Sequence, residues 1–222
     1  MEETTSVKQP VTDNTRERLL DRSEILFAHK GFAAVSVREI TGSANCNLSA
    51  VNYYFGNKMN LYISVFKERW IPRMKQVRQY ADDYLSSRQT IGISDIIRAF
   101  AKAFLDGPIT DEERIYHFHL MQREIAHPTE ALKMVVDEII HPMHKDIRGL
   151  IKPSLPENLS SEKLALSIFT TISMILYFGF AQPVISLVMD QKFDPAFKSR
   201  VIDHIVSFAM NGINGLKKEE TV

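Results

Sequence analysis

The chain has 222 residues, which is enough for one large domain or two small ones. Its 27 Lys and Arg residues balance 27 Asp and Glu residues, so the formal net charge of zero excludes a histone-like polyanion binder but allows a local basic patch. A composition of 45% apolar and 24% charged residues excludes a disordered chain. The single cysteine, Cys46, excludes an internal disulfide and a cysteine-rich zinc module. It also favours a reducing, cytoplasmic compartment.

The chain begins with a polar segment, residues 1–13, which we expect to be a disordered arm without the apolar core of a secretion signal. Asn14 and Glu17 have the spacing of a capping box, which predicts that the first helix begins at Asn14. Gly31 is placed to end that helix. Because helix signals recur along the whole chain while strand alternation and hairpin turns are weak, the sequence predicts an all-α fold.

Two shorter helices are predicted next. Ser36, which stands three residues before a glutamate, opens a helix over 37–44. Asn45 can adopt the left-handed conformation that a tight turn needs. Asn47 is then a suitable cap for a helix over 48–54.

Longer helices are expected in the rest of the chain. One runs from Lys58 toward Asp83, and Pro128 and Pro195 each stand at a suitable first helical position. Further helices are predicted over 91–106, 111–126, 128–151, 161–180 and 195–217. The expected organisation is the arm, a helix-turn-helix domain over 14–57, a helical domain over 58–217 and a tail over 218–222.

The three short helices have the proportions of a helix-turn-helix domain, because a turn of about three residues separates the second from the third. In such a domain the last helix lies in the major groove, with its first turns facing base edges. The predicted DNA contacts are Ser36, Arg38, Asn47, Leu48, Ser49, Ala50, Asn52, Tyr53, Tyr54 and Lys58.

These candidates have different expected roles. Asn47, Ser49 and Asn52 can hydrogen-bond bases or phosphates, and a phenol of the following tyrosine pair can reach a phosphate. Lys58, at the start of the next helix, is a natural phosphate contact. Residues 13–58 hold six cations and five anions, so the DNA-binding prediction depends on the pattern of residues and not on charge.

A family resemblance follows from several segments taken together, namely 18–20, 26–27, 30–32, 35–40 and 48–58. They resemble the DNA-binding domain of TetR-family transcriptional regulators over about residues 14–66. The segment 52–56, and Arg123-Glu124 with Pro128-Thr129, further resemble the CecR-like branch. The chain departs from the family pattern at five positions, which are Arg22, Ser23, Asn45, Cys46 and Met59.

The resemblance implies a sequence-specific DNA-binding regulator, a repressor that a small-molecule effector of unknown identity releases from a palindromic operator. It also implies a homodimer formed through the last two long helices. The uncharged stretch over 164–180 and an apolar stripe on the last helix suit such an interface. No cofactor and no catalytic set of side chains is indicated.

The resemblance places an effector pocket between the helix that begins at Lys58 and the next three helices. An apolar wall with a few polar groups is what such a site needs. The candidate lining residues, each of which could instead be a core residue, are Trp70, Met74, Phe100, Phe104, Tyr116, His117, Met121 and Tyr177.

Other functions compete with this one. A helical small-molecule-binding protein without specific DNA binding is the main alternative. A membrane protein is another, since no charged residue occurs over 164–189, but Pro183 and several hydroxyl residues interrupt that stretch and favour a core or interface helix.

Two smaller hypotheses concern metal and redox chemistry. His117, Glu124 and His127 fall near one helix face and could hold zinc, but a polar surface or hydrogen bonding between helices is the alternative that we prefer, so no metal is predicted. Cys46 is either a redox switch or a small apolar stand-in for valine, of which we prefer the second.

Overall fold

The computed structural model describes the backbone of residues 11–219 and the side chains of residues 14–215. Over this span the ordered elements are all helices, which confirms the all-α prediction. Residues 1–10 of the expected arm and residues 220–222 of the expected tail lie outside the described residues. The chain divides into two compact units, one of residues 1–72 and 112–135 and one of residues 73–111 and 136–222.

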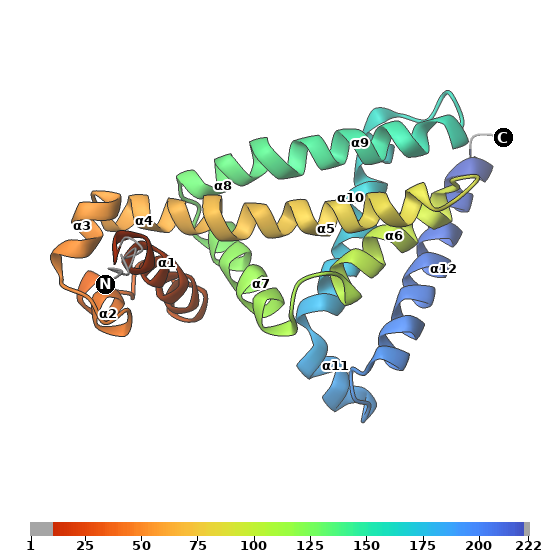
Figure 1. The fold of residues 1–222 in the computed structure, drawn as a ribbon. Helices are drawn as coiled ribbons and strands as arrows, with labels where there is room; N and C mark the ends of the chain where they lie inside the picture. Colours follow the sequence, from red (N-terminus) through yellow and green to blue (C-terminus); the bar gives the residue numbers. More distant parts are fainter. Residues whose placement is uncertain (1–10, 220–222) are drawn as a thin grey trace, which may run out of the picture. The chain divides into compact units, whose positions relative to one another are not determined.

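The first unit holds the helices predicted for the helix-turn-helix domain together with a later segment. Helices α1 and α3 pack against α4, and α2 packs against α1 and α3 (Figure 1). The segment that returns to this unit supplies most of α7 and all of α8. In chain order, the elements are α1 (Val11–Lys30), α2 (Val37–Ser43), α3 (Ser49–Phe55), α4 (Lys58–Val65), η1 (Phe66–Trp70), α7 (Asp111–Ala126) and α8 (Glu130–Val135).

Helix α1 is held by apolar contacts on one side and by ion pairs on another. Leu19, Leu20 and Phe27 of α1 are fully buried. The Arg16 guanidinium donates two hydrogen bonds to the Glu68 carboxylate, at 2.7 and 2.5 Å. The bidentate geometry fixes the orientation of both side chains as well as their separation, so α1 has a defined register against η1.

Several predicted helix ends in this unit are confirmed and others are wrong. Gly31 ends α1 with φ +81° and donates its N–H to the Phe27 carbonyl, and Asn45 is left-handed with φ 49°. Helix α1 begins at Val11, so Asn14 lies inside the helix and does not cap it. The predicted cap at Asn47 is also wrong, because α3 begins at Ser49 and its N-cap, Leu48, has no side-chain bond.

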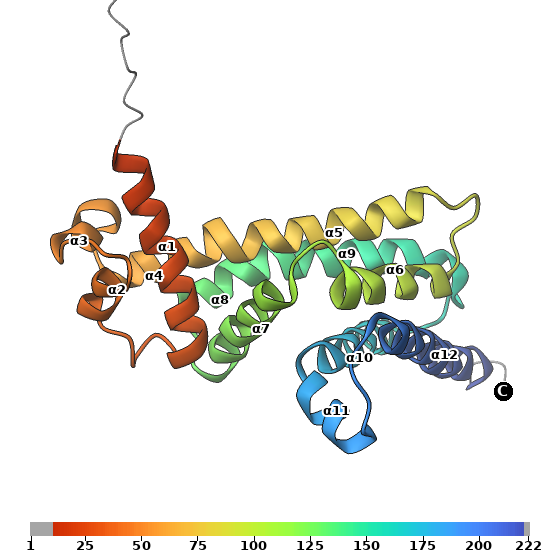
Figure 2. The ribbon, with the colours of Figure 1, turned by 60° about the horizontal axis from the view of Figure 1, so that its bottom comes forward.

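The second unit is built around α6 (Ile93–Asp106), which packs against α9, α10 and α12. Figure 2 shows how α11 links α10 to α12. The other elements are α5 (Ile71–Ser86), η2 (Val136–Ile140), α9 (His141–Ile151), η3 (Lys152–Ser154), α10 (Ser161–Phe180), α11 (Gln182–Met189) and α12 (Pro195–Glu219).

The predicted ends of the long helices vary in accuracy. The bounds of α7 and α10 agree with the prediction, and α12 begins at Pro195, where the Asp194 carboxylate accepts the Phe197 N–H at 2.8 Å. The prediction that Pro128 opens a helix is wrong, since α8 begins at Glu130. The sequence analysis predicts no separate helix over the residues of α11.

Two π-helical segments occur where the chain passes between the units, and each ends two residues before a proline. The segment η1 precedes Pro72, and η2 precedes Pro142. A proline inside a helix removes one N–H donor and presses on the carbonyl four residues earlier. For Pro72 that carbonyl belongs to Glu68, and it accepts instead from the Arg69 guanidinium at 3.2 Å. The wider turns therefore have an identifiable cause in the sequence.

Candidate DNA-binding surface and effector cavity

Helix α3 has one buried side and one exposed side. Val51 and Phe55, one turn apart, are buried against the other helices of the first unit. Leu48, Ser49 and Asn52 are exposed. The exposed side combines hydroxyl and amide groups with a small apolar surface, which is the chemistry that reads base edges in a major groove.

Tyr53 and Tyr54 stand at the end of this exposed side. Tyr53 is 78% exposed, and its ring meets that of Tyr54 edge to face with the centroids 4.9 Å apart. Phe55, the next residue, is buried. The aromatic contact supports the Tyr53 ring on the protein while most of the residue's surface remains exposed.

The N-cap and first turn of α2 also carry polar groups. The Ser36 hydroxyl accepts the Glu39 N–H at 3.1 Å and so caps α2, whereas Arg38 is exposed. The Glu39 carboxylate pairs with Lys30 at 2.6 Å, and this hydrogen bond keeps the pKa of Glu39 below its ordinary value. Ser36 therefore already has a structural role, and Arg38 is the more available of the two predicted contacts.

Cys46 lies in the turn between α2 and α3. Its thiol is partly buried and lies 3.7 Å from the Thr41 carbonyl oxygen, to which it donates. Burial raises the pKa of the Cys46 thiol. A raised pKa lowers the thiolate population, which is the opposite of what a reactive redox cysteine requires.

Lys58 begins α4, whose first turn is capped by the Asn57 side chain. The Lys58 ammonium lies 4.3 Å from the centroid of the Phe32 ring, a cation–π distance, and burial lowers its pKa. The Phe32 ring thus holds the ammonium near the start of α4.

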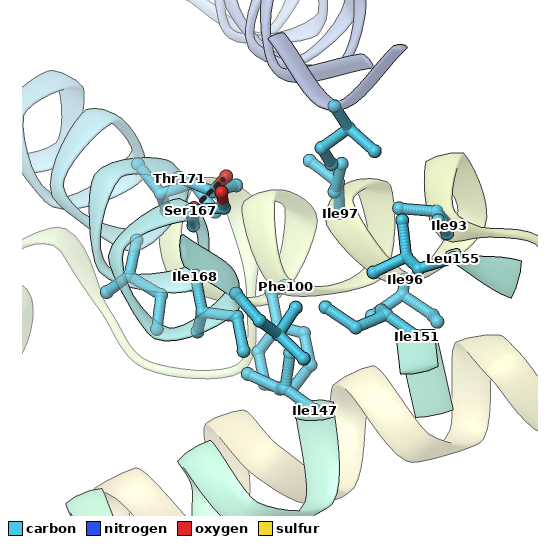
Figure 3. A pocket seen from close by; sticks show the side chains of 14 residues that line it. Ile93, Ile96, Ile97, Phe100, Ile147, Ile151, Leu155, Ser167, Ile168 and Thr171 are labelled. Carbon is cyan, nitrogen blue, oxygen red and sulfur yellow. Dashed lines mark hydrogen bonds between the residues drawn. The ribbon is translucent and has the colours of Figure 1, made fainter. Parts of the chain in front are cut away.

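An apolar cavity of about 40 Å³ lies wholly within the second unit (Figure 3). Helices α6, α9, α10 and α12 and the segment after α9 supply its wall. The lining residues are Ile93, Ile96, Ile97, Phe100, Ile147, Ile151, Leu155, Leu164, Ser167, Ile168, Thr171, Ile172, Ile175 and Ile213. None of them carries a charge.

The two hydroxyl groups in this wall are engaged with their own helix. Ser167 donates to the Lys163 carbonyl at 2.8 Å, and Thr171 donates to the Ser167 carbonyl at 2.9 Å. Their protons are therefore not offered to the cavity. A charged guest would lose its hydration there without gaining an ionic partner, which costs several kcal/mol or more.

The structure distributes the predicted pocket residues over both units. Phe100 lines the cavity. Trp70 and His117 stack in the buried part of the first unit, and Tyr177 is half exposed on the outside of α10. The others are Met74 and Phe104, which are buried, and Tyr116 and Met121, which are partly exposed.

The sequence reasoning missed the isoleucines of α6 and α9 that line the cavity together with α10. Their spacing was a usable signal: Ile93, Ile96, Ile97 and Phe100 recur every three or four residues, as does the pair Ile147 and Ile151 on α9. The pattern shows which side of each helix is buried but not how completely the helices fill the space between them.

Two of the three hypothetical zinc ligands have other partners. His117 stacks on Trp70, and the Glu124 carboxylate accepts hydrogen bonds from Tyr62 and Thr129. Within the part of the chain that the structure describes, no group of three His, Cys, Asp or Glu side chains is placed to hold a metal ion. For Glu124 the structure shows hydrogen bonding between helices, which was one of the two alternatives to a metal site.

Helix α10 has an apolar side that the rest of the chain leaves exposed. Leu166 and Phe169 are more than half exposed, as is Phe208 of α12. A groove between α10 and α12 runs along this side, with Thr170, Met174 and Gly212 in its wall. Among the described residues, α10 is the one helix whose length and composition would allow it to cross a membrane, and core helices of soluble proteins also have such a length and composition.

Two family models match the chain. The model for bacterial regulatory proteins of the tetR family matches residues 19–65, and the model described as "HTH-type transcriptional dual regulator CecR, C-terminal domain" matches residues 93–213, more than half of the chain. The chain belongs to the CecR-like branch of the TetR family. It is a DNA-binding transcriptional regulator, and its family consists of regulators, not enzymes.

Individual relatives agree with this assignment. The chain is 24% identical over 182 residues to the HTH-type transcriptional dual regulator CecR of Shigella flexneri, which covers 79% of this chain and 80% of that protein. It is 33% identical over 63 residues to the HTH-type transcriptional repressor NicS of Pseudomonas putida, covering 28% of this chain and 30% of that protein. A TetR-like transcriptional regulator from Rhodococcus sp. RHA1 shares the fold with a TM-score of 0.62 and 13% identity, over 95% of this chain and all of that chain. TetR-family regulators bind DNA operators and usually act as dimers.

Proposed function

We propose that this TetR-family regulator is a cytoplasmic homodimeric repressor that inserts α3 of each subunit into one half of a palindromic operator. The observation that carries this proposal is the division of α3 into a buried apolar side and an exposed side with Ser49, Asn52 and Tyr53. Two such helices per dimer read two half-sites, and their binding energies combine.

The second copy is expected on the apolar side of α10 and α12. Leu166, Phe169 and Phe208 would be covered there, and the groove between the two helices offers space for side chains of a partner helix. Gly212 has open space where a Cβ would stand, so a helix can approach the backbone closely at that point. Two helices from each chain would then form a four-helix bundle.

The effector is proposed to be an uncharged, largely apolar compound that enters the cavity of the second unit. The isoleucine-rich wall has no charge, and its two hydroxyl protons are bonded within α10. A volume of about 40 Å³ is too small for a compound of more than a few heavy atoms. Binding of a larger apolar compound therefore requires the wall helices to move, and this links effector binding to a conformational change.

A matched pair of probes tests the effector proposal: the uncharged fluorophore N-phenylnaphthylamine and its sulfonated counterpart. Wild-type protein should bind the uncharged probe and discriminate against the sulfonate. Ile168→Phe, which adds volume inside the cavity, should weaken probe binding at least about tenfold. Ile115→Phe makes the same change at an exposed position of α7 and should leave probe binding unaltered.

The control of DNA binding is tested with the same probe and an operator selected from random duplex DNA. Saturating probe should weaken operator binding by some factor, and saturating operator should weaken probe binding by that same factor. Equal probe affinity with and without operator would contradict the proposed release mechanism. Preference for the sulfonated probe would contradict the proposed chemical class of the effector.

A further inference from the structure

Two adjacent side chains of α7, Arg123 and Glu124, connect helices that are far apart in the sequence, and all the connections lie within the first unit. The Arg123 Nε donates to the Ala28 carbonyl at 3.0 Å, and its Nη2 donates to the His29 carbonyl. These carbonyls belong to the last turn of α1, where helix carbonyls have no partner further along the helix. Arg123 therefore caps the end of α1.

Glu124 makes the second half of the connection. Its carboxylate is 1% exposed and accepts a 2.7 Å hydrogen bond from the Tyr62 hydroxyl of α4. It also accepts the backbone N–H groups of Thr129 and Leu132, at 3.0 and 3.1 Å, and the Thr129 hydroxyl at 3.0 Å. One buried carboxylate thus ties α4 to the first turn of α8.

The fit around Arg123 is close. A Cβ on Gly31 would stand 3.0 Å from Arg123 Nη1, and Gly31 has a φ of +81°. The turn between α1 and α2 is therefore shaped to admit the guanidinium. A buried Glu124 carboxylate without its hydrogen-bond donors would cost free energy. We therefore expect Arg123 and Glu124 either to make all of these hydrogen bonds or to lose them together.

We propose that Arg123 and Glu124 are positioning residues for operator binding, which hold α1 and α4 of the helix-turn-helix domain in the arrangement that fits DNA. The inference depends on the operator binding proposed above. It adds that α7 acts on the DNA-binding helices through these two side chains. A displacement of α7 would release the end of α1 and the Tyr62 hydroxyl together.

The test uses Arg123→Met, which removes all donors but keeps an apolar stem, and Glu124→Gln, which keeps the shape but removes the charge. Both should weaken binding to an operator selected by the wild-type chain at least about tenfold, because the fraction of protein in the DNA-competent arrangement falls. The slope of affinity against salt should stay unchanged, since no phosphate contact is removed.

Phe118→Leu is the matched control, because it removes core volume from the same helix and leaves both sets of hydrogen bonds in place. All variants are compared at a temperature where circular dichroism shows them fully folded. Should Glu124→Gln fail to fold, Tyr62→Phe removes a single hydroxyl and should still weaken operator binding. Unchanged operator affinity in Arg123→Met and Tyr62→Phe would overturn the inference, as would an equal loss in Phe118→Leu.

Amide hydrogen exchange tests the inference without DNA. In Arg123→Met the amides of residues 27–34 should exchange faster than in Phe118→Leu at the same overall stability. Wild-type rates there would overturn the inference even if the chain proved to bind no operator. A wild-type chain that selects no operator would instead contradict the proposed function, so the two failures are distinguishable.

Discussion

Trp70 and His117 stack face to face, with ring centroids 4.2 Å apart and ring planes 10° apart, and Trp70 Nε1 donates to the His117 carbonyl at 3.1 Å. Both residues are almost fully buried in the first unit. Both are candidate lining residues of the effector pocket that the family resemblance implies, with a core position as the alternative. The stack favours the core position, in which the two rings fix η1 against α7.

Trp70→Phe tests this structural role. Phenylalanine keeps an aromatic ring in the stack but is smaller and has no N–H, so buried volume and the hydrogen bond to the His117 carbonyl are lost. We expect a loss of about 1–3 kcal/mol of unfolding free energy, measured by chemical denaturation and circular dichroism. Tyr53→Phe is the control, since its ring is largely exposed and its stability should not change. Unchanged stability in Trp70→Phe would contradict the assignment.

The helices could be predicted from local signals, and their ends only in part. The positive φ values of Gly31 and Asn45 could be predicted, because glycine and asparagine are the residue types that adopt this conformation most readily. Asparagine is a residue type that often caps helices, but neither Asn14 nor Asn47 is an N-cap here. Helix α1 already begins at Val11, before Asn14, and α3 begins only at Ser49, after Asn47. Local residue preference is a weak guide to a helix end when tertiary packing fixes it.

The partners of buried polar groups could not be predicted. The spacing of His117, Glu124 and His127 suggested one helix face, but the Tyr62 hydroxyl that bonds Glu124 comes 62 residues earlier. Such a partner depends on which helices pack together, and one sequence does not carry that information. The exposed side of α3 could be predicted because it depends only on spacing within one helix.

Lys58→Met tests the predicted phosphate contact. Methionine keeps a flexible apolar stem over the Phe32 ring but carries no charge. Operator binding should weaken for every DNA sequence, and the slope of log affinity against log salt should become shallower by about 1. Lys75→Met, an identical change in the second unit, should leave the slope as in wild type. A full wild-type slope in Lys58→Met would remove this contact from the account.

Asn52→Ala tests base readout by α3. An asparagine amide can bond adenine with two hydrogen bonds, so its removal should relax the preference at one position of each half-site and not lower affinity uniformly. Selection from random DNA with wild type and variant measures this directly. An identical selected motif for both proteins would show that Asn52 reads no base.

Cys46 should react slowly with alkylating reagents near neutral pH. Burial raises the pKa of the thiol above its ordinary value, so the reactive thiolate is scarce until the solution becomes strongly alkaline. The rate of iodoacetamide modification of native protein is compared with that of the same protein in denaturant. A native rate as fast as the denatured one would revive the redox-switch hypothesis.

His119 should make folding stability depend on pH. Burial is the largest cause that lowers its pKa below 6.5, with further contributions from His29 and Arg123. The folded state therefore disfavours the protonated ring, so the stability from this group is present above about pH 6.5 and is lost as the pH falls below it. Thermal unfolding of wild type and His119→Gln between about pH 7.5 and 5.5 measures the effect. The variant should show a weaker decline, and parallel curves would contradict the assignment.

The most direct test of the central claim is selection by the purified wild-type chain from random duplex DNA at physiological salt, followed by measurement of how many chains bind the selected site. The account predicts an enriched palindrome with half-sites about one helical turn apart, bound by two chains. No enrichment by folded, dimeric protein, or an asymmetric site bound by one chain, would contradict it.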